Sequence, residues 1–155
     1  MSRAINNIYT ILNNPFKLME LIVHFYSSYE NQDKDILLSY LILPLVLNRD
    51  SRKKLLNLNR NGCNLLSLTK NSNTVVGLEQ MIEEYRNITN ECIQIALLNG
   101  YLELNENKSL IRTDKGLKNE SFKFREEYIA IRNFAVILKS NDIVTIYRML
   151  GVKKI

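Results

Sequence analysis

Two apolar stretches near the start of the sequence predict buried helices. From Pro15 to about Tyr29, apolar residues fall on nearly every side of a helix, which is typical of a helix at the centre of a core. Asn14 can cap this helix, and Pro15 suits its first position. Residues 36–47 are almost wholly apolar but too few for a bilayer span, which needs about twenty residues. We therefore predict a second core helix there, bent or ended by Pro44.

The middle of the chain shows one helical pattern over residues 74–85, a second over residues 89–99, and then a hairpin pattern. Thr89 can cap the second helix, and Gly100 can end it, because a residue free to adopt positive φ ends a helix at low cost. Residues 101–113 alternate as two half-buried strands around a polar tip. This order is typical of a winged helix. We predict a mainly α fold with a small β-hairpin: a winged helix-turn-helix domain with flanking N- and C-terminal helices.

The last third of the chain is also predicted to be helical. Residues 120–139 bring apolar side chains to one broad face. Asn141 or Asp142 can cap a last short helix over residues 143–150. The leucines within residues 65–68 form either a short helix or a strand, since their spacing does not decide between the two.

The length of the chain predicts a single domain over residues 1–155. Within it, residues 74–116 are the predicted helix-turn-helix plus wing, and residues 120–155 are a C-terminal helical extension. A chain of this size buries roughly two-thirds of the surface of its unfolded state, so it needs no metal or disulfide to hold it together.

The charge favours an anionic partner without requiring one. The net charge is +5 and the isoelectric point is about 9.2. Basic residues gather directly after the second core helix and again on the predicted wing. They are either ordinary solvated side chains or contacts to nucleic acid or to an acidic partner surface, and a basic wing can lie along a phosphate backbone without reading bases. The residues are Arg49, Arg52, Lys53, Lys54 and Arg60 in the first group, and Lys108, Arg112 and Lys115 in the second.

The predicted helix over residues 89–99 argues against base reading. A recognition helix normally brings Arg or Lys to phosphates and guanines. Residues 87–100 contain neither, and their one charged residue is Glu91. Asn90 and Gln94 have side chains suited to adenine, but no neighbouring cation would neutralise the DNA backbone. A protein contact or a structural role is the favoured interpretation.

The sequence offers no obvious set of catalytic or metal-binding residues. His24 is the one histidine, and it lies in a helix predicted to be buried, where packing is more common than catalysis. Cys63 and Cys92 lie far apart with no CxxC motif, which argues against zinc and favours a reducing compartment. The five glycines form no phosphate-binding loop. We predict a non-enzyme with no metal and no cofactor and, since the N-terminus has no apolar signal core, a cytoplasmic protein without membrane contact.

Three stretches resemble a known family. Residues 14–16 (NPF) open an apolar helix, residues 43–52 (LPLVLNRDSR) resemble that family's apolar LPLVLH run and the basic segment after it, and residues 145–152 (TIYRMLGV) are close to its TIFxLLGV ending. They follow the family's order from start to end, so the resemblance covers nearly the whole chain. The family is the middle component of bacterial ABC-type three-component systems, the small subunit of Lamassu-type defence operons. Asn48 stands where a His is common, and Asp50 where a Pro is common.

The resemblance implies a non-catalytic subunit between an SMC/Rad50-like ATPase and a separate effector, often a nuclease, in defence against phage or plasmids. ATP hydrolysis and DNA cleavage would then come from those partners. We expect the tail or an apolar surface of the chain to dock on the ATPase, while the basic residues face double-stranded DNA or an acidic subunit surface. The tail residues expected to dock are Thr145, Ile146, Tyr147, Leu150 and Val152.

Two alternatives belong to other classes of protein. A small winged-helix transcription regulator, acting as a dimer, should carry Lys or Arg on the helix over residues 89–99, and this sequence does not. A small enzyme is disfavoured by the lack of an acid–base set.

Overall fold

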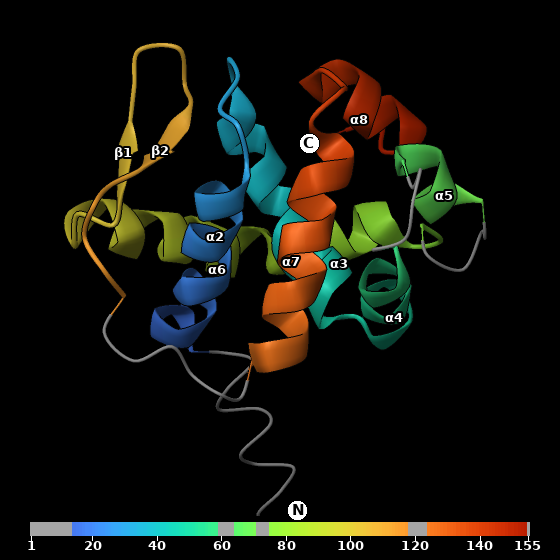
Figure 1. The fold of residues 1–155 in the computed structure, drawn as a ribbon, viewed down its shortest axis with the longest axis horizontal. Coiled ribbons are helices and arrows are strands. Elements are labelled where there is room, and N and C mark those ends of the chain that lie inside the picture. Colours follow the sequence, from blue (N-terminus) through green and yellow to red (C-terminus); the bar gives the residue numbers. More distant parts are fainter. Residues whose placement is uncertain (1–13, 59–63, 71–74, 118–123, 155) are drawn as a thin grey trace, which may run out of the picture.

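The computed structural model describes residues 14–58, 64–70, 75–117 and 124–154. In these ranges the chain forms seven α-helices, one 3-10 helix and a two-stranded antiparallel hairpin (Figure 1). The prediction of a mainly α fold with a small hairpin is confirmed. In order, the elements are α2 (Pro15–Ser28), η1 (Asp35–Leu38), α3 (Ser39–Leu47), α4 (Arg49–Asn57), α5 (Leu65–Thr69), α6 (Leu78–Leu98), β1 (Leu102–Leu104), β2 (Leu110–Arg112), α7 (Arg125–Leu138) and α8 (Ile143–Met149).

The helix α2 lies at the centre of the core, as its nearly all-round apolar pattern predicts. The elements α3, α6, α7 and β2 all pack against it. It begins as expected: Oδ1 of Asn14 accepts a hydrogen bond from the backbone N–H of Phe16 at 3.1 Å, and Pro15 takes the first helical position. Its fully buried side chains are Leu18, Leu21, Ile22, Val23 and Phe25.

The second predicted core helix is present as η1 followed by α3. Pro44 lies inside α3, and the helix ends at Leu47. Asn48 then adopts an extended conformation with φ −71° and ψ 129°, which separates α3 from α4. The fully buried side chains of α3 include Leu41, Ile42, Leu43, Leu45 and Val46.

The break predicted between two helices in the middle of the chain is wrong. Residues 78–98 form one continuous helix, α6, where the sequence pattern predicted separate helices over residues 74–85 and 89–99. The turn of the predicted helix-turn-helix is therefore missing, and the winged-helix topology is not confirmed. The buried face of α6 continues through the expected break as one stripe made of Leu78, Ile82, Thr89, Cys92, Ile93 and Ala96.

Thr89 shows why the helix continues. Its side chain is fully buried within α6 and does not cap a helix, and its hydroxyl has no hydrogen-bond partner in the part of the chain that the structure describes. Between Tyr85 and Thr89 there is no Gly or Pro to stop a helix. The packing of one long apolar stripe therefore prevails over the local capping preference of Thr89.

The predicted hairpin is confirmed as β1 and β2. Leu102 pairs with Arg112 and Leu104 with Leu110 in an antiparallel register. Gly100, with φ +74°, follows the end of α6, as the expected stop for that helix. At the tip, Lys108 adopts a left-handed conformation with φ +61°.

A buried carboxylate attaches the hairpin to the loop before η1. Asp35 is fully buried, and one of its oxygens accepts a hydrogen bond from the backbone N–H of Leu110 at 2.8 Å. The other oxygen accepts from the backbone N–H of Gln32 and the side-chain amide of Asn31, each at 3.1 Å. Burial raises the pKa of the Asp35 carboxyl, and these three donors oppose the rise. All three partners are donors, so the position requires a group that only accepts.

The C-terminal helices follow the predicted caps. Oδ1 of Asp142 accepts a hydrogen bond from the backbone N–H of Thr145 at 2.7 Å and starts α8, and Gly151, with φ +73°, follows its end. The leucines of residues 65–68 are helical, in α5, behind a capping box of Asn64 and Ser67. None of the described helices combines the length and the apolar character needed to cross a bilayer.

We expect Asp35→Asn to lower the free energy of unfolding by about 2–4 kcal/mol, because the new amide N–H groups would face donors that now have a carboxylate acceptor. Urea unfolding followed by circular dichroism measures this loss. Asp33→Asn is the matched control, since Asp33 is exposed in the same loop, and we expect it to change stability by less than about 0.5 kcal/mol. Equal stabilities for the two variants would contradict the anchoring role of Asp35.

Candidate interaction surfaces

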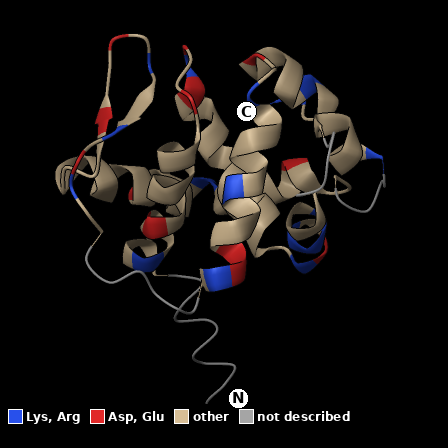
Figure 2. Ribbon diagram, in the orientation of Figure 1, with Lys and Arg blue, Asp and Glu red and all other residues tan. Residues whose placement is uncertain are grey.

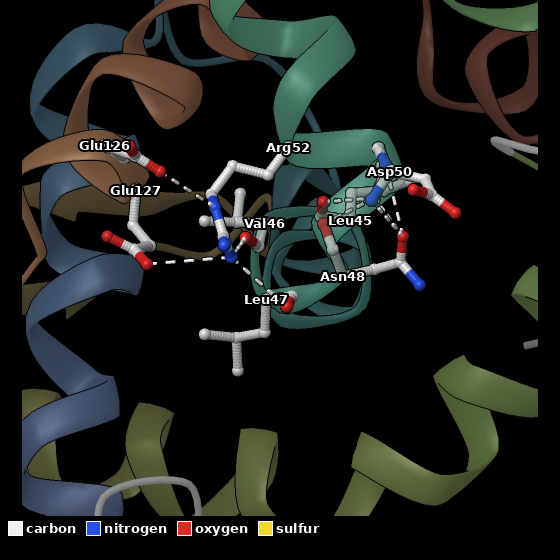
Figure 3. A network of polar contacts seen from close by, with 9 residues as sticks. Leu45, Val46, Leu47, Asn48, Asp50, Arg52, Glu126 and Glu127 are labelled. Carbon is white, nitrogen blue, oxygen red and sulfur yellow. Dashed lines mark hydrogen bonds and ion pairs between the residues drawn. The ribbon is translucent and has the colours of Figure 1, made fainter. Parts of the chain in front are cut away.

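Arg52, one of the predicted anion contacts, is held by the chain itself (Figure 3). Its Nη1 donates to the backbone oxygens of Val46 at 3.1 Å and Leu47 at 3.3 Å, at the end of α3 where carbonyl groups lack helical partners. Its guanidinium also forms ion pairs with Glu126 and Glu127 at the start of α7, each at 3.6 Å. The side chain is 20% exposed. Arg52 therefore joins α3, α4 and α7 and is not directed at solvent.

Asn48 caps the start of α4. Oδ1 of Asn48 accepts hydrogen bonds from the backbone N–H of Asp50 at 3.0 Å and of Ser51 at 3.1 Å. The hydroxyl of the buried Ser51 donates to the backbone oxygen of Leu45 in α3. The helix α4 is thus tied to α3 on one side and, through Arg52, to α7 on the other.

The other basic residues of this segment differ in their surroundings. Lys54 is half-buried, and its Nζ lies 3.4 Å from the backbone oxygen of Leu68 in α5. Arg49 and Lys53 are exposed on α4. Arg60 lies outside the described residues. Of the first predicted basic group, the structure therefore leaves Arg49 and Lys53 directed outward.

The basic residues of the hairpin are also largely used within the chain. The guanidinium of Arg112 donates to the backbone oxygen of Tyr101 at 2.9 Å and to that of Lys115, and to the hydroxyl of Ser27 at 3.2 Å. The ammonium of Lys115 donates to the backbone oxygen of Asn99 and lies 4.8 Å from the centre of the Tyr101 ring.

The contacts of the Arg112 and Lys115 side chains connect the segment after β2 to the residues that follow the end of α6. Of the second predicted basic group, only Lys108, at the exposed tip of the hairpin, is not held in this way by a described contact. The tip is therefore the part of the hairpin where a cation is presented to solvent.

The described residues of the two predicted basic groups do not form one surface. Figure 1 places the hairpin and α4 at opposite ends of the molecule, and Figure 2 shows acidic residues interspersed with basic ones at both places. The helix between them, α6, presents an acidic surface through its exposed residues Glu79, Glu83, Glu84 and Glu91.

Asn90, considered above as a reader of adenine, already accepts a hydrogen bond from the hydroxyl of Tyr40 at 2.6 Å. Its carboxamide oxygen is therefore engaged within the chain. Together with the acidic residues around it, this makes the exposed side of α6 unsuited to lie in a DNA groove.

Most of the tail residues expected to dock are buried in the chain's own core. Ile146 and Leu150 are 0% and 1% exposed, and Tyr147 donates its hydroxyl hydrogen to the backbone oxygen of Leu37. Val152 is also buried, and Thr145 is half-buried. A partner therefore reaches neither Ile146 nor Leu150 without a rearrangement of the fold, whereas Tyr147 and Val152 keep a small part of their surface at the side of α8.

The exposed side of α8 carries two residues that are not among the predicted docking residues. Val144 is 66% exposed, and Arg148 lies on the same side at i+4 spacing. The sequence contains a signal for this exposed side, because one apolar and one basic residue alternate with the buried positions of the helix. The motif-like residues of this segment, by contrast, include the buried positions Ile146 and Leu150.

Cys63 lies outside the described residues, and the two other candidates, His24 and Cys92, pack against neighbouring side chains. His24 is half-buried on α2 with its ring centre 4.6 Å from that of Tyr128. Cys92 is buried, and burial raises the pKa of its thiol to about 12, so the thiol is protonated near pH 7. Across the described residues, no three His, Cys, Asp or Glu side chains gather as metal ligands would.

The comparison with protein families identifies the class of this protein. Residues 2–154 match the family described as ABC-three component (ABC-3C) system Middle Component 3. The chain therefore belongs to this family of middle components, in agreement with the resemblance carried by its three sequence stretches. No match is found among the curated proteins or among the solved structures that were compared.

We expect Arg52→Ala to destabilise the fold by about 1–3 kcal/mol, because it leaves backbone oxygens of α3 and the carboxylate of Glu127 without their partner. Thermal unfolding of the purified chain measures the loss. Lys53→Ala, which removes the neighbouring exposed cation, is the control and should leave stability within about 0.5 kcal/mol. An Arg52→Ala variant as stable as the control would show that these contacts do not hold α4 in place.

Proposed function

We propose that this chain is a non-catalytic bridging subunit of a defence complex against phage or plasmids. It would link an SMC/Rad50-like ATPase to an effector, often a nuclease, in a system of the Lamassu type in the cytoplasm. One observation carries the proposal: the family match spans residues 2–154, so nearly the whole chain corresponds to a middle component. A component of a three-component system has two kinds of partner, and a middle subunit that joins them is the simplest arrangement.

The chemistry of the described side chains supports a non-catalytic role. A general base needs access to a substrate, whereas His24 packs against Tyr128. A nucleophilic cysteine needs a depressed pKa, whereas burial raises that of Cys92. The proposal therefore assigns ATP hydrolysis and nucleic-acid cleavage to the other components.

Direct contact with double-stranded DNA is the second part of the proposal. Arg49 and Lys53 project from α4, which is held rigidly by Arg52 and Asn48, and Lys108 projects from the tip of the hairpin. Such cations bind phosphates without reading bases.

A long helix followed by a hairpin also keeps the order expected of a recognition helix and wing, and we propose the winged-helix relationship on that basis. The acidic exposed side of α6 opposes base reading and hence the transcription regulator.

Co-expression with the products of the two neighbouring genes tests the bridging role. We expect the chain to form a binary complex with the ATPase, another with the effector, and a ternary complex with both, with masses determined by native mass spectrometry. The control is co-expression of ATPase and effector without this chain, which should give no complex of the two. A stable ATPase–effector complex in that control would contradict bridging, and a lone homodimer tightly bound to one DNA sequence would favour the regulator.

We expect the double variant Arg49→Glu with Lys53→Glu to weaken DNA binding by the complex. The salt dependence should also weaken: the negative slope of the logarithm of the binding constant against that of the salt concentration should become shallower by about 2, one unit for each lost phosphate contact. Fluorescence anisotropy with a duplex at several salt concentrations measures both. Arg132→Glu, an exposed position on α7, is the control for a general effect of charge, and an unchanged slope in the double variant would assign DNA contact to the partners alone.

A further inference from the structure

An apolar groove runs beside α8, where that helix, η1 and the chain after Gly151 meet. Its volume is about 480 Å³, and it is open to solvent along one side. The lining side chains are mostly apolar, with two cations among them: Leu37, Ile143, Val144, Tyr147, Arg148, Val152 and Lys153. Binding sites for flexible segments and small molecules commonly have volumes of about 300–1,000 Å³, so this groove has room for more than one side chain.

The walls of the groove are fixed by hydrogen bonds. The hydroxyl of Tyr147 donates to the backbone oxygen of Leu37, which joins α8 to η1. After Gly151 the chain turns back, and the backbone N–H of Val152 donates to the oxygen of Tyr147 at 3.0 Å. A groove whose walls are already in place requires little ordering when a partner binds, and this favours affinity.

The chain after Gly151, which forms one wall of the groove, is attached to α6 by one carboxylate. Oε1 of Glu79 accepts hydrogen bonds from the backbone N–H groups of Lys153 and of Lys154, the second at 3.2 Å. These bonds lower the pKa of the Glu79 carboxyl, which is therefore ionised at neutral pH. Only the backbone of these lysines takes part in this attachment, and both residues are exposed.

The charges at the groove indicate the chemistry of its occupant. Arg148 and Lys153 line the groove, and Lys154 follows directly. Two carboxylates lie beside these cations, and each is engaged with backbone N–H groups. Asp142 caps α8, and the N–H of Thr145, with a smaller effect of Arg148, lowers the pKa of its carboxyl. Glu79 accepts from the backbone N–H groups of Lys153 and Lys154. An occupant with carboxylates beside its apolar side chains therefore complements both the apolar lining of the groove and the cations beside it.

Resting on the proposed function, we infer that this groove binds a short acidic segment of a partner subunit whose apolar side chains enter beside Val144. A middle component must present a surface to the other components, and Val144 is a large apolar side chain at 66% exposure beside a preformed groove. The inference also changes the docking surface of α8. It is the exposed side, with Val144 and Arg148, and not the buried residues Ile146 and Leu150.

Site-specific crosslinking in the assembled complex tests this assignment. A photo-crosslinking amino acid is placed at Val144 and, as the matched control, at Val136, which is 55% exposed on α7. The three components are co-expressed, the complex is purified and irradiated, and the linked peptides are identified by mass spectrometry. We expect position 144 to link to a segment of a partner subunit that is rich in Asp or Glu beside apolar residues, and position 136 not to link to that segment.

Each other outcome overturns the inference in a distinguishable way. A link from position 144 to a second copy of this chain makes the groove a self-association site, and a link to nucleic acid makes it part of a nucleic-acid surface. No link at position 144 in an assembled complex shows that the groove stays uncovered. Failure of the unmodified chain to assemble with the other components defeats the proposed function first, and the inference with it.

Substitutions give a quantitative second measurement. We expect Val144→Asp, and separately Arg148→Glu, to weaken binding of the purified chain to the complex of the other two components by about tenfold or more, as for residues central to an interface. The effect of Arg148→Glu should shrink as salt is raised, because its partner is a carboxylate. Val136→Asp and Arg132→Glu are the controls, and all four variants change exposed positions, so their melting temperatures should match that of the original chain. Equal binding by Val144→Asp and Val136→Asp would overturn the inference.

Discussion

The burial of α2 on every side is the constraint on which the rest of the fold depends. A helix with apolar residues all around its circumference is stable in water only when other elements cover each face. The helices α3, α6 and α7 and the strand β2 provide that cover. The hairpin is consequently part of the core packing through β2 and not an independent appendage, and α8 closes the structure over η1 and α5.

Charged side chains hold the surrounding elements in place. Asp35 attaches the hairpin to the loop before η1, Arg52 joins α3 to α7, and Glu79 holds the chain after α8 to α6. A net charge of +5 therefore says little about which cations a partner can reach. Arg52, Lys54, Arg112 and Lys115 have partners within the chain, so a sequence count of basic residues overstates the basic surface.

Local chemistry made several elements predictable from sequence. The cap at Asn14, the cap expected at Asn141 or Asp142, the stop at Gly100 and the presence of the hairpin follow from short-range hydrogen bonding and backbone conformation. The helix start predicted at Thr89 is wrong because a threonine that caps a helix and one that is buried within a helix cannot be told apart in the sequence. Only the position of the neighbouring α2 and α3 decides that this part of α6 is buried and continuous.

The candidate surfaces were less predictable for the same reason. The exposure of Arg52 depends on α7, which begins far along the chain, and no local pattern places Glu126 and Glu127 beside it. On α8, the motif-like residues Ile146 and Leu150 are those that pack inward. A match to a family motif therefore does not show whether a residue packs in the core or contacts a partner. The burial of the side chain in the structure distinguishes the two roles.

The 3-10 helix η1 is shared between two distant parts of the molecule. At its start, the backbone N–H of Ile36 donates to the oxygen of Lys108 in the hairpin tip at 3.2 Å, and Asp35 holds Leu110. At its other end, Leu37 accepts the hydroxyl hydrogen of Tyr147 on α8. The hairpin tip and α8, which lie far apart in the sequence, are therefore held by hydrogen bonds to the same four-residue helix, so the position of each depends on η1.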